Sequence, residues 1–136
     1  RCPGKTEAAM AARSVKMSDL SFSELREVNV HRCINGFGHR LEDWSPAEWL
    51  CALCGEAGEA ANIAKKIIRH RDKVAGNKGE DMDLEALRLK LGRELADVVI
   101  YADLAAASQG LDLGKLVKQT FNAKSREIGS TDLIQE

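Results

Sequence analysis

Two apolar stretches of this chain each carry a pair of acidic residues at a spacing of three, and this pattern constrains the fold most. Glu56 and Glu59 lie within WLCALCGEAGEAANIA, and Glu94 and Asp97 lie within LGRELADVVIYADLAAA. Both stretches are otherwise nearly uncharged and typical of buried helix, where an acid is rare unless it is paired or binds a metal. A spacing of three puts both carboxylates on one helical face. Two such helices packed antiparallel would therefore bring four carboxylates together.

Four clustered carboxylates predict a site for hard divalent cations with oxygen ligands, Mg²⁺ first and Mn²⁺ as the alternative. With 21 acids in 136 residues, pairs at this spacing also arise by chance on solvated faces, but apolar neighbours such as Leu53 and Val98 favour the metal site. A di-iron carboxylate bundle of oxidative function is a rival. Such sites use Glu-x-x-His pairs, whereas His31, His39 and His70 lie elsewhere in this chain.

Helical periodicity and end signals predict an all-α domain of four helices. Ser45 and Pro46 supply a cap and an N1 proline, and Gly110 a C-terminal stop. The helices are expected at about 22–37, 46–70, 84–109 and 112–128, with a charged loop at 71–83. We predict a flexible N-terminal extension over residues 1–20, one domain over 21–130 and a C-terminal tail over 131–136.

Composition excludes several classes of function. The net charge of −1 gives no surface for nucleic acid, and no apolar run is long enough to span a membrane. The four cysteines suggest neither disulfides nor a zinc site, because the pair Cys51 and Cys54 lies inside an apolar helical run. We expect the cysteines to be small core residues in a reducing, cytoplasmic protein. Gly55 and Gly58 predict either the close approach of a phosphate or metal shell, or a close helix crossing.

The motifs together resemble one known family. The segments LCGEAGEAANIAKK and ELADVVIYADLA, followed by a Lys-x-x-x-Asn at Lys118 and Asn122, are similar to the signature of the MazG-like all-α nucleoside triphosphate pyrophosphatases. The resemblance covers about residues 22–129, with a longer stretch between Glu59 and Glu94 than is usual in the family. It implies a four-helix bundle that assembles as a homo-oligomer. It also implies Mg²⁺-dependent hydrolysis of a (deoxy)nucleoside triphosphate to the monophosphate and pyrophosphate, which cleans the nucleotide pool.

The resemblance assigns roles to individual residues. Glu56, Glu59, Glu94 and Asp97 would hold the metal, and Glu56 or Glu59 is the candidate general base. His31 resembles a base-contacting histidine of deoxycytidine-type relatives. On the pyrophosphate side, the resemblance points to four residues near the end of the last helix: Lys118, Asn122, Lys124 and Arg126.

Position along the helices suggests further substrate contacts. Lys66 lies seven residues after Glu59 and could reach a phosphate. Tyr101 lies four residues after Asp97, on the same face, where it would pack on a sugar and disfavour a 2′-hydroxyl. Trp44, with Phe37 as the second candidate, is expected to stack on the base. Trp49 is expected in the core.

Two functional hypotheses follow from different classes of protein. The first is a nucleotide pyrophosphohydrolase that acts on a nucleoside triphosphate as a homo-oligomer, with a tetramer favoured over a dimer. The alternative is a catalytically silent helical module that keeps the fold for oligomerisation or regulation. Because all four acids are present, the sequence favours the enzyme.

Overall fold

The computed structural model describes residues 19–75 and 83–135, and these contain helices and turns without a strand. The four α-helices are α1 (Phe22–His31), α2 (Pro46–Arg71), α3 (Leu84–Ser108) and α4 (Leu113–Glu127), with a π-helix η1 (Arg32–Gly36) and a 3₁₀-helix η2 (Leu41–Asp43) between α1 and α2. The prediction of an all-α chain with four helices is confirmed. The predicted extension lies outside the described residues up to position 18, and so do residues 76–82 of the charged loop.

Side chains at the helix starts hold the helix ends as the sequence predicts. Ser45 caps α2 reciprocally, because its hydroxyl accepts from the Glu48 amide while the Glu48 carboxylate accepts from the Ser45 amide at 2.7 Å. The Asp112 carboxylate accepts from the amide of Lys115 at 2.9 Å and starts α4. Gly110 lies between α3 and α4 with a φ of 65°, a conformation that favours glycine.

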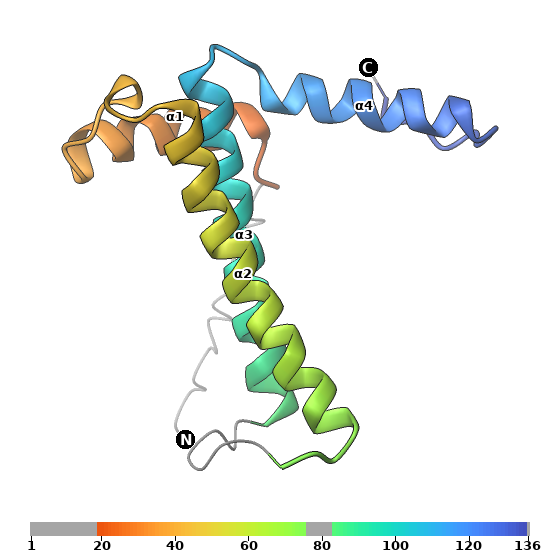
Figure 1. The fold of residues 1–136 in the computed structure, drawn as a ribbon. Coiled ribbons are helices and arrows are strands. Elements are labelled where there is room, and N and C mark those ends of the chain that lie inside the picture. The colour runs from red at the N-terminus through yellow and green to blue at the C-terminus, as the bar shows by residue number, and fades with distance from the viewer. Residues whose placement is uncertain (1–18, 76–82, 136) are drawn as a thin grey trace, which may run out of the picture.

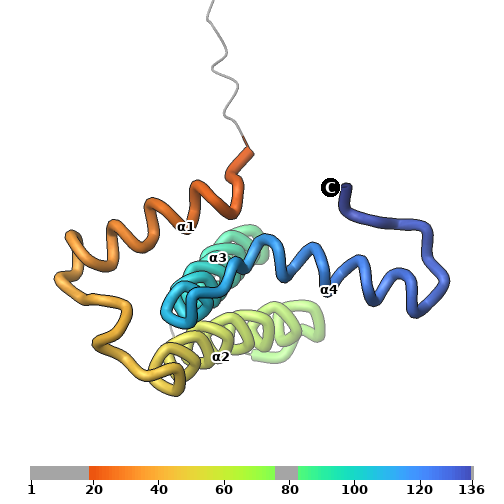
Figure 2. The backbone as a smooth tube through the Cα atoms, turned by 90° about the horizontal axis from the view of Figure 1, so that it is seen from above, coloured from red at the N-terminus to blue at the C-terminus, as the bar shows by residue number. Residues whose placement is uncertain are grey.

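The helices α2 and α3 form a long antiparallel hairpin, and α1 packs against the end of α3 (Figure 1). A cluster of Cys33, Trp49 and Leu104 forms the core at that end of the hairpin. The last helix, α4, leaves α3 and extends away from the hairpin, as the view in Figure 2 also shows. A single chain therefore does not close its four helices into the predicted bundle.

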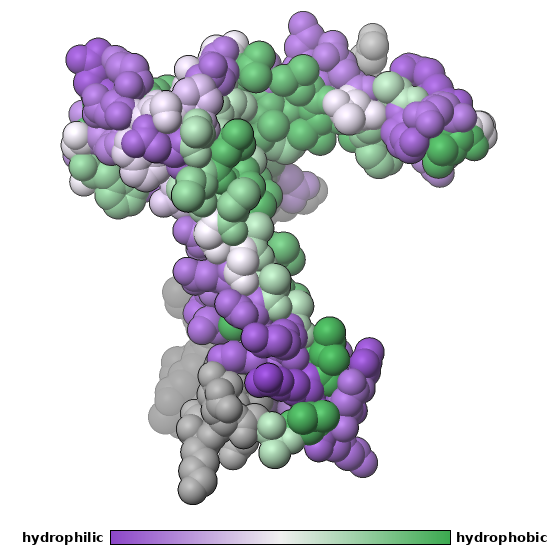
Figure 3. All heavy atoms as spheres, in the orientation of Figure 1, coloured by the Kyte–Doolittle hydropathy of each residue, from purple (hydrophilic) through white to green (hydrophobic). Residues whose placement is uncertain are grey.

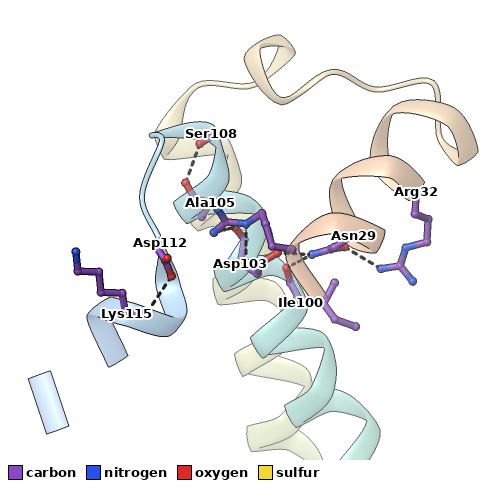
Figure 4. A network of polar contacts seen from close by, with 9 residues as sticks. Asn29, Arg32, Ile100, Asp103, Ala105, Ser108, Asp112 and Lys115 are labelled. Carbon is purple, nitrogen blue, oxygen red and sulfur yellow. Dashed lines mark hydrogen bonds and ion pairs between the residues drawn. The ribbon is translucent and has the colours of Figure 1, made fainter. Parts of the chain in front are cut away.

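A buried ion pair fixes α1 on α3. The Asp103 side chain is 1% exposed, and its carboxylate accepts from Nε of Arg26 at 2.8 Å and from Nδ2 of Asn29 at 3.2 Å (Figure 4). Both oxygens of this buried carboxylate thus have a partner, which its burial requires. The pair sets the position of α1 along α3.

The two acid-bearing stretches are less buried than predicted, and this part of the prediction is wrong for a single chain. Leu95 on α3 is 52% exposed, Phe121 on α4 is 48% exposed, and Cys51 and Cys54 are exposed instead of lying in the core. Hydrophobic residues gather on the surface where α4 leaves α3 (Figure 3). The reason is that α4 does not fold back over the hairpin, so these faces have no covering helix in their own chain. None of the described helices combines the length and the apolar character that crossing a bilayer needs.

Candidate metal centre and adjoining pocket

Carboxylates from α2 and α3 converge midway along the hairpin. One oxygen from each of Glu56, Glu59 and Glu94 lies within 4.8 Å of the other two. Glu56 and Glu94 are half-buried, whereas Glu59 is exposed. Asp97, one turn after Glu94, lines a pocket together with Glu56 but lies outside the group of three. The antiparallel pairing of two helices therefore brings together three of the four acids that the sequence singled out and puts the fourth beside them.

The charges of this cluster repel one another. The pKa of Glu56 is raised above its ordinary value of 4.5, first because the carboxyl is partly removed from water and then because Glu59, Asp97 and Glu94 repel its charge. Mutually repelling carboxylates from two helices suit a divalent cation, which would neutralise them.

A pocket of about 410 Å³ opens beside the acids, between α3 and the segment that joins α1 to α2. Acidic groups from Glu56 and Asp97 line it together with the aromatic rings of Trp44 and Tyr101. This volume is within the usual range for small-molecule sites, and the mixture of aromatic walls and a few polar groups is typical of them. The remaining lining comes from Arg32, Cys33, Phe37, His39, Trp49, Ile100 and Leu104.

The aromatic wall of the pocket comes from the segment between α1 and α2 and from Trp49 in the first turn of α2. The rings of Trp44 and Trp49 lie 4.6 Å apart between centroids, and the His39 ring meets that of Trp44 edge-on at 4.6 Å. Trp49 is buried, as predicted, and its indole donates to the carbonyl of Leu41 at 3.0 Å. Nδ1 of His39 is the one buried side-chain nitrogen or oxygen in the described part of the chain that lacks a hydrogen-bond partner. The pocket therefore offers a flat ring surface, whereas Nδ1 of His39 is enclosed by protein.

Several of the residues singled out from the sequence do not line this pocket. His31 is exposed at the end of α1, and the imidazole in the pocket belongs to His39. Lys66 is half-buried on α2 and is absent from the pocket lining. Gly55 and Gly58 meet no neighbouring atom within 4 Å of an added Cβ, so no helix of the same chain, in its described part, crosses close to either glycine.

The basic residues of α4 lie apart from the acids of the same chain. Lys118, Asn122 and Arg126 line a separate cavity of about 350 Å³ on α4, and α4 extends away from the hairpin (Figure 1). Asn122 is buried, and its side-chain amide makes two hydrogen bonds to the backbone of Ile134, at 2.8 and 3.0 Å. Lys124 is exposed and pairs with Glu127 on the same helix. One chain therefore does not bring the phosphate contacts suggested on α4 to its own acids.

Arg32, His39 and Asp103 were not among the site residues predicted from the sequence. Asp103 has the same signal that identified the other acids, a carboxylate within the apolar stretch YADLAAA. The signals for the other two are weaker, because they depend on how the connector between α1 and α2 folds. Comparison of the chain with protein-family models, with curated proteins and with solved structures finds no match in any of the three.

Proposed function

We propose that this chain is a Mg²⁺-dependent nucleotide pyrophosphohydrolase. It would cleave a (deoxy)nucleoside triphosphate to the monophosphate and pyrophosphate, and so remove unwanted nucleotides from the pool. One observation carries the proposal: the carboxylates of Glu56, Glu59 and Glu94 lie within 4.8 Å of one another, at the edge of an aromatic-lined pocket of about 410 Å³. That combination suits a ligand with charged phosphates at one end and a flat ring at the other.

The carboxylates fit Mg²⁺, or Mn²⁺ in its place, because they supply closely spaced oxygen atoms from two helices. Bound divalent cations supply charge neutralisation of the phosphates and a water of lowered pKa. Glu56, Glu59, Glu94 and Asp97 are the proposed ligands. Glu56 and Glu59 are both candidates to accept the proton of the attacking water.

The aromatic end of the pocket would hold the nucleoside. Trp44 offers a face for stacking on the base, and the ring of His39, which lines the same pocket, packs edge-on against that of Trp44. Tyr101 lies one turn after Asp97 on α3 and lines the same pocket, where its ring would lie against the sugar. His39, and not the predicted His31, is the histidine of this pocket.

We further propose that the active form is a homo-oligomer, a tetramer in preference to a dimer. The hairpin and α4 each expose apolar residues that a second copy of the chain could cover. These are Leu95 and Val99 on the hairpin, and Val117 and Phe121 on α4. Patches of this kind mark interaction surfaces. Pairing between copies would also allow the basic cavity of α4 to approach the acids of a neighbour.

The proposal is tested by measuring pyrophosphate release from a panel of ribo- and deoxynucleoside triphosphates, with and without Mg²⁺. We expect Mg²⁺-dependent release from at least one of them. Glu56→Ala and Asp97→Ala should each abolish most of it, while Glu85→Ala, an exposed acid in the first turn of the same α3, should not. If no nucleotide yields pyrophosphate, or if both site variants keep their turnover, the chain is better explained as a silent oligomerisation or regulatory module.

A further inference from the structure

Arg32 is the only lysine or arginine among the described residues that line the pocket. It begins the π-helix η1, where the Phe37 amide donates to the Arg32 carbonyl at 3.1 Å. Its guanidinium lies 5.8 Å from the centre of the Phe37 ring. π-Helical turns are rare and often occur at functional sites, because the extra residue in the turn redirects the side chains around it. Arg32 lines both this pocket and a neighbouring cavity of about 210 Å³ that Asn29 also lines, so its side chain lies at the boundary between the two.

Two buried residues fix where the Arg32 guanidinium lies. Asn29 is 2% exposed, and its Nδ2 donates to the Ile100 carbonyl at 3.0 Å and to the Asp103 carboxylate at 3.2 Å. Because both of these bonds need the amide nitrogen, the amide oxygen must face the other way. That oxygen accepts from Nη2 of Arg32 at 3.2 Å, as Figure 4 shows. The buried Asp103 therefore orients Asn29, and Asn29 holds Arg32.

The anchor of Arg32 lies away from the acid cluster. Ile100, whose carbonyl holds Asn29, comes six residues after Glu94 and three after Asp97 on α3, which corresponds to roughly 9 Å and 4.5 Å along the helix axis. Phosphates held near Glu94 would thus leave the nucleobase closer to Arg32. The aromatic residues Phe37 and Trp44 line the same pocket and suit a base. This order along α3 makes a base a better partner for Arg32 than a phosphate.

We propose that Arg32 is a specificity-determining residue that donates hydrogen bonds to acceptor atoms on the edge of the nucleobase, and that Asn29 and Asp103 position it. This inference rests on the proposed function. A guanidinium edge has two parallel donors, so it favours a base with two adjacent acceptors. Guanine has them in O6 and N7 and cytosine in O2 and N3, whereas the acceptors of adenine are each next to a donor or a C–H group. The pocket should therefore prefer dCTP or dGTP to dATP.

The first test compares kcat/KM for dCTP, dGTP, dTTP and dATP in the wild type, Arg32→Ala and Arg32→Lys. Arg32 is exposed, so its replacement should leave the fold intact, which circular dichroism would check. We expect Arg32→Ala to lower kcat/KM for the preferred substrate by roughly 10- to 100-fold, mainly through KM, and to reduce the preference over dATP. Arg32→Lys should retain only part of the wild-type preference over dATP. Arg88→Ala, an exposed arginine on α3 outside the pocket, should change neither.

A second arm distinguishes the base from the phosphates as the partner of Arg32. Tripolyphosphate with Mg²⁺ lacks a base, so its inhibition constant should be the same in the wild type and in Arg32→Ala. A large loss of that inhibition, with the base preference unchanged, would show that Arg32 binds phosphate and would overturn the proposal. The effects of Asn29→Ala and Arg32→Ala on base preference should not add in the double variant, since Asn29 acts through Arg32.

The outcomes separate the two proposals. If the wild type hydrolyses nucleotides but Arg32→Ala keeps the same base preference, or if the wild type has none, the role given to Arg32 is wrong and the proposed function stands. If the wild type releases no pyrophosphate from any nucleotide, the proposed function itself fails, and this inference fails with it.

Discussion

Replacing Glu56 by glutamine should stabilise the metal-free protein and destabilise it relative to the wild type once Mg²⁺ is present. The side chain keeps its size and loses only its charge. Glu56 takes part in two of the three carboxylate pairs whose oxygens lie within 4.8 Å. At that distance each pair repels by about 0.9 kcal/mol in a water-like dielectric, and physiological salt roughly halves this value. Removing two pairs should therefore raise the free energy of unfolding by about 1 kcal/mol.

Mg²⁺ should reverse the order of stability. A ligand at 100 times its dissociation constant stabilises the folded state by about 2.7 kcal/mol, and Glu56→Gln should lose most of that gain. The measurement is thermal unfolding of both proteins in EDTA and in a Mg²⁺ series. A difference of about 1 kcal/mol corresponds to roughly 3–6 °C in the melting temperature. The matched control is Glu85→Gln, an exposed acid in the first turn of the facing helix α3, which should respond to Mg²⁺ like the wild type. If Glu56→Gln melts below the wild type in EDTA and Mg²⁺ shifts neither protein, these carboxylates do not share an ion.

Four further predictions follow from the structure. The raised pKa of Glu56 means that the folded state binds the proton of this carboxyl more tightly than the unfolded state does. Without metal, the wild type should therefore lose stability relative to Glu56→Gln as the pH rises from about 4.5 through the raised pKa, and its affinity for Mg²⁺ should rise over the same range. If the difference in melting temperature between the two proteins does not change with pH, the carboxyl is not perturbed. Arg26→Met leaves the buried Asp103 charge without its cation and should lower the free energy of unfolding, measured by urea denaturation, by about 2–4 kcal/mol. The control Arg40→Met breaks only an exposed pair and should lower it by less than about 1 kcal/mol. Phe121→Glu should reduce the mass measured by light scattering to that of a single chain, and a wild type that is already monomeric at micromolar concentration would refute the assembly. Tyr101→Ala should reduce a wild-type preference for dCTP over CTP in kcat/KM, and equal values in the wild type would count against contact between this ring and the sugar.

The helices and their caps could be predicted because their signals are local. Ser45, Pro46 and Asp112 act through hydrogen bonds or backbone angles within one turn of themselves. The convergence of Glu56 with Glu94 was also predictable, although these residues are distant in the sequence, because two long helices that follow one another along the chain commonly pack antiparallel and each pair of acids lies on one helical face.

The pocket could be predicted only in part, because its wall depends on the connector between α1 and α2. The π-helix η1 shifts the register of the chain by one residue relative to an α-helix, and hydrophobic periodicity does not reveal this shift. His39 follows η1 and lines the pocket, whereas His31, which precedes η1, is exposed and does not line it. Asp103 shows a different limit: the sequence identifies an acid in an apolar helix, but only the structure shows whether a cation such as Arg26 already balances it.

The extension of α4 from the hairpin also has a consequence for how this protein folds. A helix of 15 residues is marginal in water by itself, and most helical stability comes from packing of an apolar face. Within the chain, the first turn of α4 is capped by Asp112 and packs at Gly114 against Phe22 of α1, whereas the bonds from Asn122 to Ile134 tie the rest of α4 only to the tail. The order of this outer part of α4 should then depend on protein concentration more strongly than that of the hairpin and α1. Folding of this part of α4 and association of the chains would then occur together.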